Sequence, residues 1–113
     1  MSKLRTKLIS YDELPDPSSK GFVISTTSIE LNIFLVRKNN KIIVYENSCP
    51  HTSGPLDWLP DSFLDDDNKY IICANHGALF QINDGVCVFG PCKEQSLREL
   101  PFVIDDGDIY LLT

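Results

Sequence analysis

Cys49-Pro50-His51 and Cys73-Ala74-Asn75-His76-Gly77 are the two stretches that decide how this chain is interpreted. The chain contains only two histidines, and each follows a cysteine with one or two residues between them. Pro50 stiffens the first stretch, and Gly77 allows the backbone to turn after His76. Thiolates and imidazoles are both metal ligands. The pattern therefore predicts two short loops that supply Cys49, His51, Cys73 and His76 to one metal site.

This donor set is compatible with different metal sites, or with no metal site at all. Structural zinc sites commonly join Cys-x2–4-Cys to His-x3–5-His, so that like ligands are paired in sequence. Here each loop mixes one cysteine with one histidine, which is unusual for zinc. Two surface histidines and two core cysteines without metal are the plain alternative, but this leaves both cysteine–histidine pairs unexplained. An iron–sulfur centre with mixed ligands explains the pairs directly.

Cys-x-His, 21 intervening residues and Cys-x-x-His-Gly together resemble the Rieske ferredoxin family. The resemblance covers about the last two-thirds of the chain. It implies one Rieske-type 2Fe–2S cluster as cofactor. In that arrangement Cys49 and Cys73 hold the buried iron, while His51 and His76 hold the outer iron and face solvent.

The same resemblance implies a fold. We expect an all-β, Rieske-like antiparallel β-sandwich that forms a single domain over residues 1–113. A small cluster-binding subdomain of loops and short strands is expected at about residues 47–92. In the family a third, proline-containing loop covers the cluster, and Gly90-Pro91 stands in the corresponding place.

The implied function is one-electron transfer without a catalytic residue, because four protein ligands leave no position for substrate. The chain resembles the ferredoxin components of bacterial aromatic-ring dioxygenase systems, in which a flavoprotein reductase loads the ferredoxin and the ferredoxin feeds a separate oxygenase. One alternative is a small Rieske-like subunit of an NAD(P)H-dependent nitrite reductase, although many members of that branch lack the ligands. A zinc-stabilised interaction module without a redox role is the other.

Length, composition and net charge limit the classes of partner that this chain can bind. A chain of 113 residues with 42% hydrophobic residues suits one modest core, and the net charge of −6 argues against nucleic acid and against an anionic membrane surface. An acidic carrier would dock best on a basic partner face. No segment approaches the roughly 18 apolar residues that span a bilayer. The expected location is the cytoplasm, where cysteines point to metal binding before disulfides.

Short apolar runs between turn residues predict strands throughout the chain. The two longest, 30–37 and 41–46, are joined by Lys38-Asn39-Asn40, a hairpin signature. Residues 47–68 contain no credible element and are predicted as one long loop. The remaining expected strands are 7–10, 21–25, 69–72, 78–82, 86–89, 100–104 and 108–112, with tight turns at Asn83-Asp84-Gly85 and Asp105-Asp106-Gly107.

Departures from high-potential Rieske proteins predict a low reduction potential. Those proteins carry a disulfide between the ligand loops, but Gly54 and Asn75 stand at the corresponding positions here. They also place Ser and Tyr after the second histidine as donors to sulfur, where this chain has Ala78 and Phe80. Hydrogen bonds to the sulfurs raise the potential. Without them we expect roughly −150 mV rather than +300 mV.

Two further features have plain interpretations. Cys87 and Cys92 bracket a short loop and are expected to be reduced, packed as small apolar residues, with a disulfide as the alternative. The acidic run 65–67 is expected to form a solvated turn, with docking of a basic reductase as the alternative.

Overall fold

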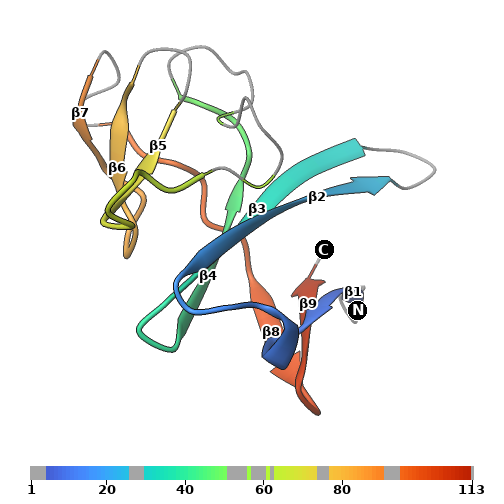
Figure 1. Ribbon diagram of the computed structural model, residues 1–113. Helices are drawn as coiled ribbons and strands as arrows, with labels where there is room; N and C mark the ends of the chain where they lie inside the picture. The colour runs from blue at the N-terminus through green and yellow to red at the C-terminus, as the bar shows by residue number, and fades with distance from the viewer. Residues whose placement is uncertain are drawn as a thin grey trace.

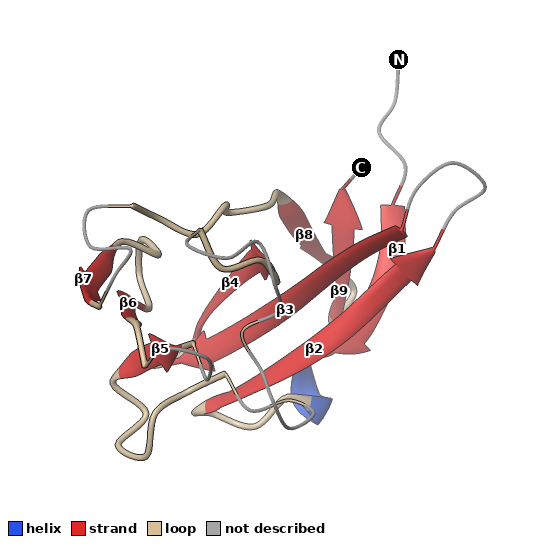
Figure 2. Ribbon diagram, turned by 90° about the horizontal axis from the view of Figure 1, so that it is seen from above, coloured by secondary structure: helices blue, strands red, loops and turns tan. Residues whose placement is uncertain are grey.

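The computed structural model describes residues 5–25, 30–50, 56, 61, 63–73, 77–90 and 95–112. Within this part of the chain, strands form three antiparallel three-stranded sheets, in the orders β2-β3-β4, β1-β9-β8 and β5-β6-β7. The β2-β3-β4 sheet lies in the middle, with the other two sheets on either side of it (Figure 1, Figure 2). The expected all-β antiparallel fold is therefore confirmed.

The central sheet is built from β2 (Ser18–Ser25), β3 (Glu30–Lys38) and β4 (Lys41–Glu46). The β3–β4 turn has Asn39 and Asn40 at φ 54° and 62°, the left-handed conformation that a tight two-residue hairpin requires. The hairpin predicted from this sequence is confirmed. β2 begins three residues earlier than its apolar run, because residues 18–20 continue the ladder with β3.

β3 and β4 are buried on both faces of the central sheet, which explains why these two strands have continuous rather than alternating apolar runs, whereas β2 is only partly buried. Alternate residues of β3 and β4 belong to different cores. We call them the base core and the cysteine core. The base core contains Leu14, Ile33, Leu35, Ile42, Val44, Leu100, Ile109 and Leu111. The cysteine core contains Phe34, Val36, Ile43, Tyr45, Cys49, Leu56, Phe63, Ile71, Cys73, Ala78, Phe80, Ile82, Cys87 and Leu97.

The base sheet brings the two ends of the described chain together. β1 (Arg5–Ser10) pairs with β9 (Asp108–Leu112), and β9 pairs in turn with β8 (Phe102–Asp105). A one-turn 3-10 helix, η1 (Tyr11–Glu13), leads from β1 towards the central sheet. Because its strands pair over four or five residues, this sheet is held by its own backbone ladder.

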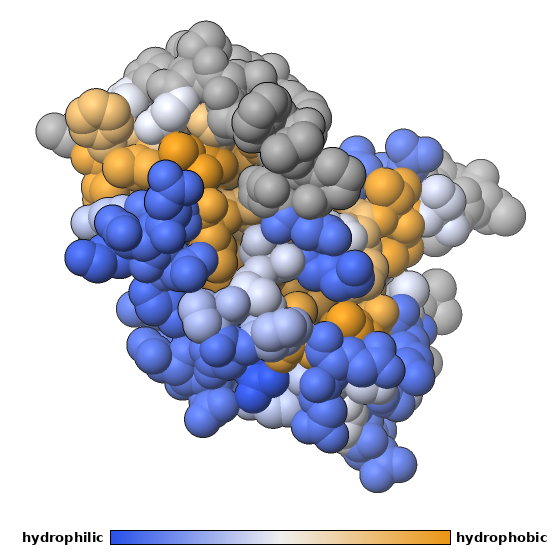
Figure 3. Space-filling view, viewed as in Figure 1, coloured by the Kyte–Doolittle hydropathy of each residue, from blue (hydrophilic) through white to orange (hydrophobic). Residues whose placement is uncertain are grey.

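The third sheet is smaller and carries most of the loops. β5 (Tyr70–Ile72), β6 (Leu79–Gln81) and β7 (Cys87–Phe89) are three residues long each. Hydrophobic residues reach the surface beside β6 and β7, whereas the base end is mostly hydrophilic (Figure 3). The sheet lies within the stretch that the sequence analysis assigned to the cluster-binding subdomain.

The other expected strands, the long loop and the acidic turn agree with the described residues. Every expected strand has a counterpart, with bounds that differ by a few residues at most. In the predicted loop at 47–68, the described residues form no strand and make one isolated bridge, Leu64 with Ile71. The acidic run is a turn, in which the Asp65 carboxylate accepts the backbone N–H groups of Lys69 and Tyr70 at 2.8 and 3.1 Å. No helix in the described ranges is long and apolar enough to cross a membrane.

Candidate metal centre

Two of the four predicted ligands lie in one buried cluster. Cys49 is 1% exposed and Cys73 is 0% exposed, and both belong to the cysteine core. Cys49 follows β4 and Cys73 follows β5, so two separate strands carry the thiols to the same region. His51 and His76 lie outside the described residues, and their part in the site stays a prediction.

The first ligand loop is held by a side chain that the sequence analysis did not select. The Asn47 amide oxygen accepts the backbone N–H of Leu56 at 2.8 Å, which ties the two ends of the segment around Cys49 together. Leu56 itself is fully buried in the cysteine core. Asparagine side chains often form hydrogen bonds with nearby backbone groups. The position of Asn47, two residues before Cys49, was therefore the sequence signal that could have indicated a role in holding this loop.

The second ligand loop is closed by its own backbone. The Cys73 N–H donates to the Ala78 carbonyl at 2.9 Å, and the Gly77 N–H donates to the Cys73 carbonyl at 2.8 Å. Gly77 has φ +67°, and a Cβ there would meet nothing within 4 Å. Glycine is therefore required for the left-handed backbone and not for space. This confirms the turn predicted after His76.

The start of the third loop packs against the second. A Cβ on Gly90, which has φ +107°, would lie 2.9 Å from the Ala78 Cα. Gly90 therefore lies against the end of the second ligand loop, while residues 91–94 lie outside the described ranges and the expectation that this loop covers the cluster stays a prediction. Ala78 and Phe80 are both buried in the core that contains the cysteines.

Tyr45 links the central sheet to the third sheet. Its hydroxyl donates to the Ile82 carbonyl at 2.7 Å, and its ring lies where a Cβ on Gly85 would come within 2.8 Å. Burial raises the pKa of Tyr45 well above its usual value, and the negative charges of Glu99 and Asp84 raise it further. Its neutral form is thus the one compatible with the fold. Sequence analysis missed this contact because it joins residues 37 positions apart.

The third cysteine of this core, Cys87, is not one of the predicted ligands. Cys87 is 2% exposed, and its thiol donates to the Phe89 carbonyl at 3.2 Å. Cys92 lies outside the described residues, so the choice between two thiols and a disulfide stays a prediction.

The donor set suits a cofactor that binds thiolates. A thiolate in an apolar core is costly unless a cation or hydrogen bonds stabilise it. Two buried cysteines in one core therefore fit a metal group with thiolate ligands, the first half of the predicted set. No group of three or more metal-ligating side chains occurs in the described ranges, from which both histidines are missing.

Comparison with known proteins agrees with this site. Residues 6–103 match the family described as Rieske [2Fe-2S] domain. No curated protein matches the sequence.

Solved structures share the fold. The ferredoxin of carbazole 1,9a-dioxygenase from Nocardioides aromaticivorans IC177 is 19% identical, with a TM-score of 0.69 over 98% of this chain and 97% of that chain. The Sphingomonas yanoikuyae B1 ferredoxin is 20% identical, with a TM-score of 0.72 over 97% and 99%. A chain of the complex of reduced oxygenase and oxidized ferredoxin in carbazole 1,9a-dioxygenase is 17% identical, with a TM-score of 0.73 over 96% and 92%.

Proposed function

The chain belongs to the Rieske [2Fe–2S] domain family, and from this premise we propose that it is a one-electron carrier. In the proposal it takes an electron from a reductase and passes it to an oxygenase-type acceptor. The observation that carries the proposal is the pair of buried cysteines, delivered by two strands to one core.

Cys49, His51, Cys73 and His76 would hold the cluster, with the cysteines on the inner iron and the histidines on the outer iron. Such a cluster, when bound, accepts and releases one electron. The chain's own residues keep the inner side dry, because Leu56, Phe80 and other apolar side chains fill the cysteine core. We propose a component that transfers electrons and carries no catalytic residue, since the four ligands leave no iron position for substrate.

The partner proposal rests on the relatives and on charge. The solved complex that shares this fold pairs a ferredoxin with the oxygenase of carbazole 1,9a-dioxygenase. A net charge of −6 favours a partner with a basic docking face, because complementary charge speeds encounter. Phe89 is 63% exposed on β7, beside Gly90, which packs against the second ligand loop. It therefore offers an apolar contact for a partner near the ligand loops. A flavoprotein reductase as donor and the cytoplasm as location complete the proposal.

The alternatives carry less support. The neighbours described above are ferredoxins, which favours a stand-alone carrier over a subunit of nitrite reductase. The family match favours an iron–sulfur cluster over a zinc-stabilised module.

Electron paramagnetic resonance of anaerobically purified protein, before and after dithionite, tests the proposal. We expect a signal only after reduction, with the low average g-value of mixed histidine–cysteine 2Fe–2S centres, and about two irons per chain. A colourless, silent protein with stoichiometric zinc from iron-replete cells would overturn it. Copurification with the other subunits of a nitrite reductase would instead support the subunit alternative.

A further inference from the structure

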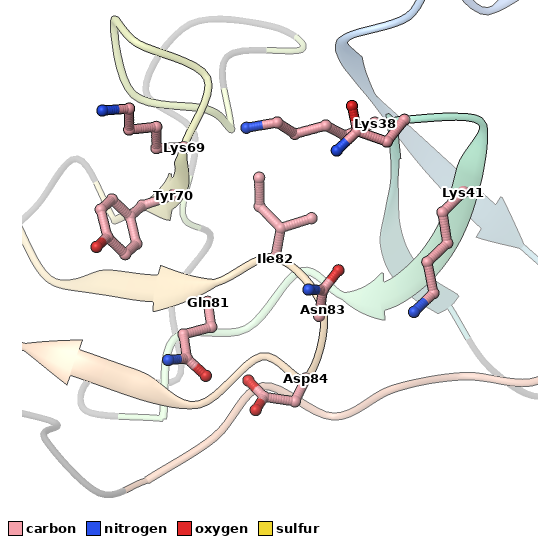
Figure 4. Close-up of a pocket in the computed structure, with 9 residues that line it drawn as sticks. Lys38, Lys41, Lys69, Tyr70, Gln81, Ile82, Asn83 and Asp84 are labelled. Atoms are coloured by element: carbon pink, nitrogen blue, oxygen red, sulfur yellow. The ribbon is translucent and has the colours of Figure 1, made fainter.

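A second candidate site lies at the end of the third sheet that points away from the ligand loops. It is a pocket of about 570 Å³ between the β3–β4 hairpin, the turn before β5 and the β6–β7 turn. Lys38 and Lys41 extend from the hairpin, Lys69 comes from the turn before β5, and Asn83 and Asp84 lie opposite (Figure 4).

Among the described residues, the three lysines are the basic side chains without an ion pair to a carboxylate. Eight of the ten Lys and Arg residues are described, and five of these form ion pairs. The other three within the described ranges are Lys38, Lys41 and Lys69, and all three line this pocket. In a chain with 16 acidic residues, three uncompensated cations from separate segments form a local positive site.

The carboxylate in the lining does not neutralise these lysines. Asp84 accepts the backbone N–H of Val86 at 3.0 Å. With the Gln81 amide nitrogen facing Asp84, that amide also donates to both carboxylate oxygens at 2.9 and 3.0 Å. Asp84 forms no ion pair with these lysines, so the lining carries three positive charges and one negative charge.

The walls of the pocket are held in place by contacts outside it. The Asp16 carboxylate accepts the N–H groups of Asn39 and Asn40 at 3.0 and 2.7 Å, which fixes the hairpin. The Lys38 ammonium donates to the Asn68 carbonyl and so joins the hairpin to the turn that carries Lys69. An ammonium has three donor hydrogens, so Lys38 keeps two for a ligand.

The pocket is separate from the predicted cluster. Lys69 lies just before β5 and Cys73 just after it, so the three-residue strand spaces them by about 10 Å or more. The base sheet, formed by the first strand and the last two strands, contributes no lining residue to this pocket.

We propose that this pocket binds a small phosphate-bearing molecule with at least two negative charges, such as pyrophosphate or the diphosphate part of a larger ligand. Ammonium groups bind phosphate as compact point charges, and three of them meet here with amide donors. The pocket volume greatly exceeds the roughly 30 Å³ share of one water, so a ligand with several oxygens fits. A hollow with polar walls favours a small ligand over a flat protein surface.

The test is calorimetric titration of pyrophosphate into the holoprotein at about 150 mM salt, where charges beyond about 8 Å are screened. Lys41 and Lys69 are exposed, so Lys41→Gln/Lys69→Gln should fold normally. The matched control is Lys7→Gln/Lys20→Gln, which removes the same charge from lysines paired with Asp108 and Asp61. The visible absorption of the cluster reports that each variant is intact.

We expect saturable one-to-one binding in the wild type and the control, weakened at least about tenfold in Lys41→Gln/Lys69→Gln. Equal weakening in both double variants would show diffuse attraction and overturn the proposal. Absence of saturable binding would overturn it as well, and citrate binding as tightly as pyrophosphate would overturn the assignment to phosphate. None of these outcomes depends on the electron-transfer role.

Discussion

The base sheet and the third sheet pack on opposite faces of the same central sheet, yet they are stabilised by different means. The base core is entirely aliphatic. Its sheet pairs β1 with β9 over five residues and adds exposed ion pairs at Arg5–Asp105 and Lys7–Asp108. The cysteine core instead combines aromatic rings with three cysteines, below a sheet of three-residue strands.

This difference leads us to expect that the two halves depend on the cluster to different extents. Long ladders and aliphatic burial stabilise the base and central sheets with residues of the chain itself, although one face of the central sheet packs on the cysteine core. The third sheet has strands of only three residues and therefore little backbone pairing, and Cys49 and Cys73 of its core would be thiolate ligands in the proposed cluster. We therefore expect the third sheet to depend on the bound cluster.

Loss of a cluster ligand should have the largest effect, and it should affect the third sheet much more than the central sheet. We expect Cys73→Ser to abolish the visible absorption and the paramagnetic signal, because a metal site of this kind is coupled to folding. Hydrogen exchange should show lost protection in β5–β6–β7 and retained protection in β2–β3–β4. Cys87→Ser is the control, since Cys87 is equally buried in the same core. A cluster retained in Cys73→Ser would remove this residue from the ligand set.

Matched truncations in the two cores should separate stability from cluster integrity. Ile109→Ala in the base core and Phe80→Ala in the cysteine core should lower the free energy of unfolding by about 2–5 and about 3–5 kcal/mol. Both side chains are fully buried. Only Phe80→Ala should also change the visible spectrum of the folded protein. Urea denaturation and absorption measure the two effects, and an altered spectrum in Ile109→Ala would contradict the separation.

Tyr45→Phe tests the bond between the central sheet and the third sheet. We expect a loss of about 1–3 kcal/mol, because the Ile82 carbonyl loses its buried donor. The control is Tyr11→Phe. The Tyr11 hydroxyl donates an exposed hydrogen bond of 3.4 Å to the Asn40 carbonyl, which should contribute under about 0.5 kcal/mol to stability. Equal effects in the two variants would show that the Tyr45 hydroxyl does not stabilise the junction.

Tyr45 also predicts a pH dependence. Its pKa is raised in the folded state, whereas an unfolded tyrosine ionises near pH 10. The resulting stabilisation is complete below about pH 10 and is lost as the pH rises further, because unfolding then releases a proton. The stability of the wild type should therefore fall more steeply above pH 10 than that of Tyr45→Phe. Parallel curves in urea titrations would contradict this.

The smallest expected effect is on the reduction potential. Ala78 and Phe80 are buried in the cysteine core and have no hydroxyl. Ala78→Ser/Phe80→Tyr should raise the potential from roughly −150 mV, since donors to the cluster sulfurs stabilise the reduced state. A shift of about 59 mV in the potential would correspond to a tenfold change in the equilibrium constant of this one-electron reduction. An unchanged potential in redox titration would show that these positions do not reach the cluster.

The sequence predicted the strands and turns well because their signals are local. Asn39-Asn40 and Asp106-Gly107 adopt the left-handed backbone that such residues tolerate, and the flanking apolar runs form the expected hairpins. For the site, the two cysteines are found together in one core as predicted. The contacts from Asn47 to Leu56 and from Tyr45 to Ile82 were not predicted, because the position of Asn47 near Cys49 does not identify Leu56 as its partner and Ile82 lies 37 positions from Tyr45.

By itself, then, the sequence determined the all-β class and the hairpin turns, since each depends on residues close together in the chain, and for the same reason it predicts the cysteine–histidine donor set. Tertiary structure alone decided which face of each apolar strand meets which core, and that the first and last strands share a sheet. It alone also gathered Lys38, Lys41 and Lys69 around one pocket. These outcomes depend on burial and pairing between distant segments, which are settled only when the whole chain packs.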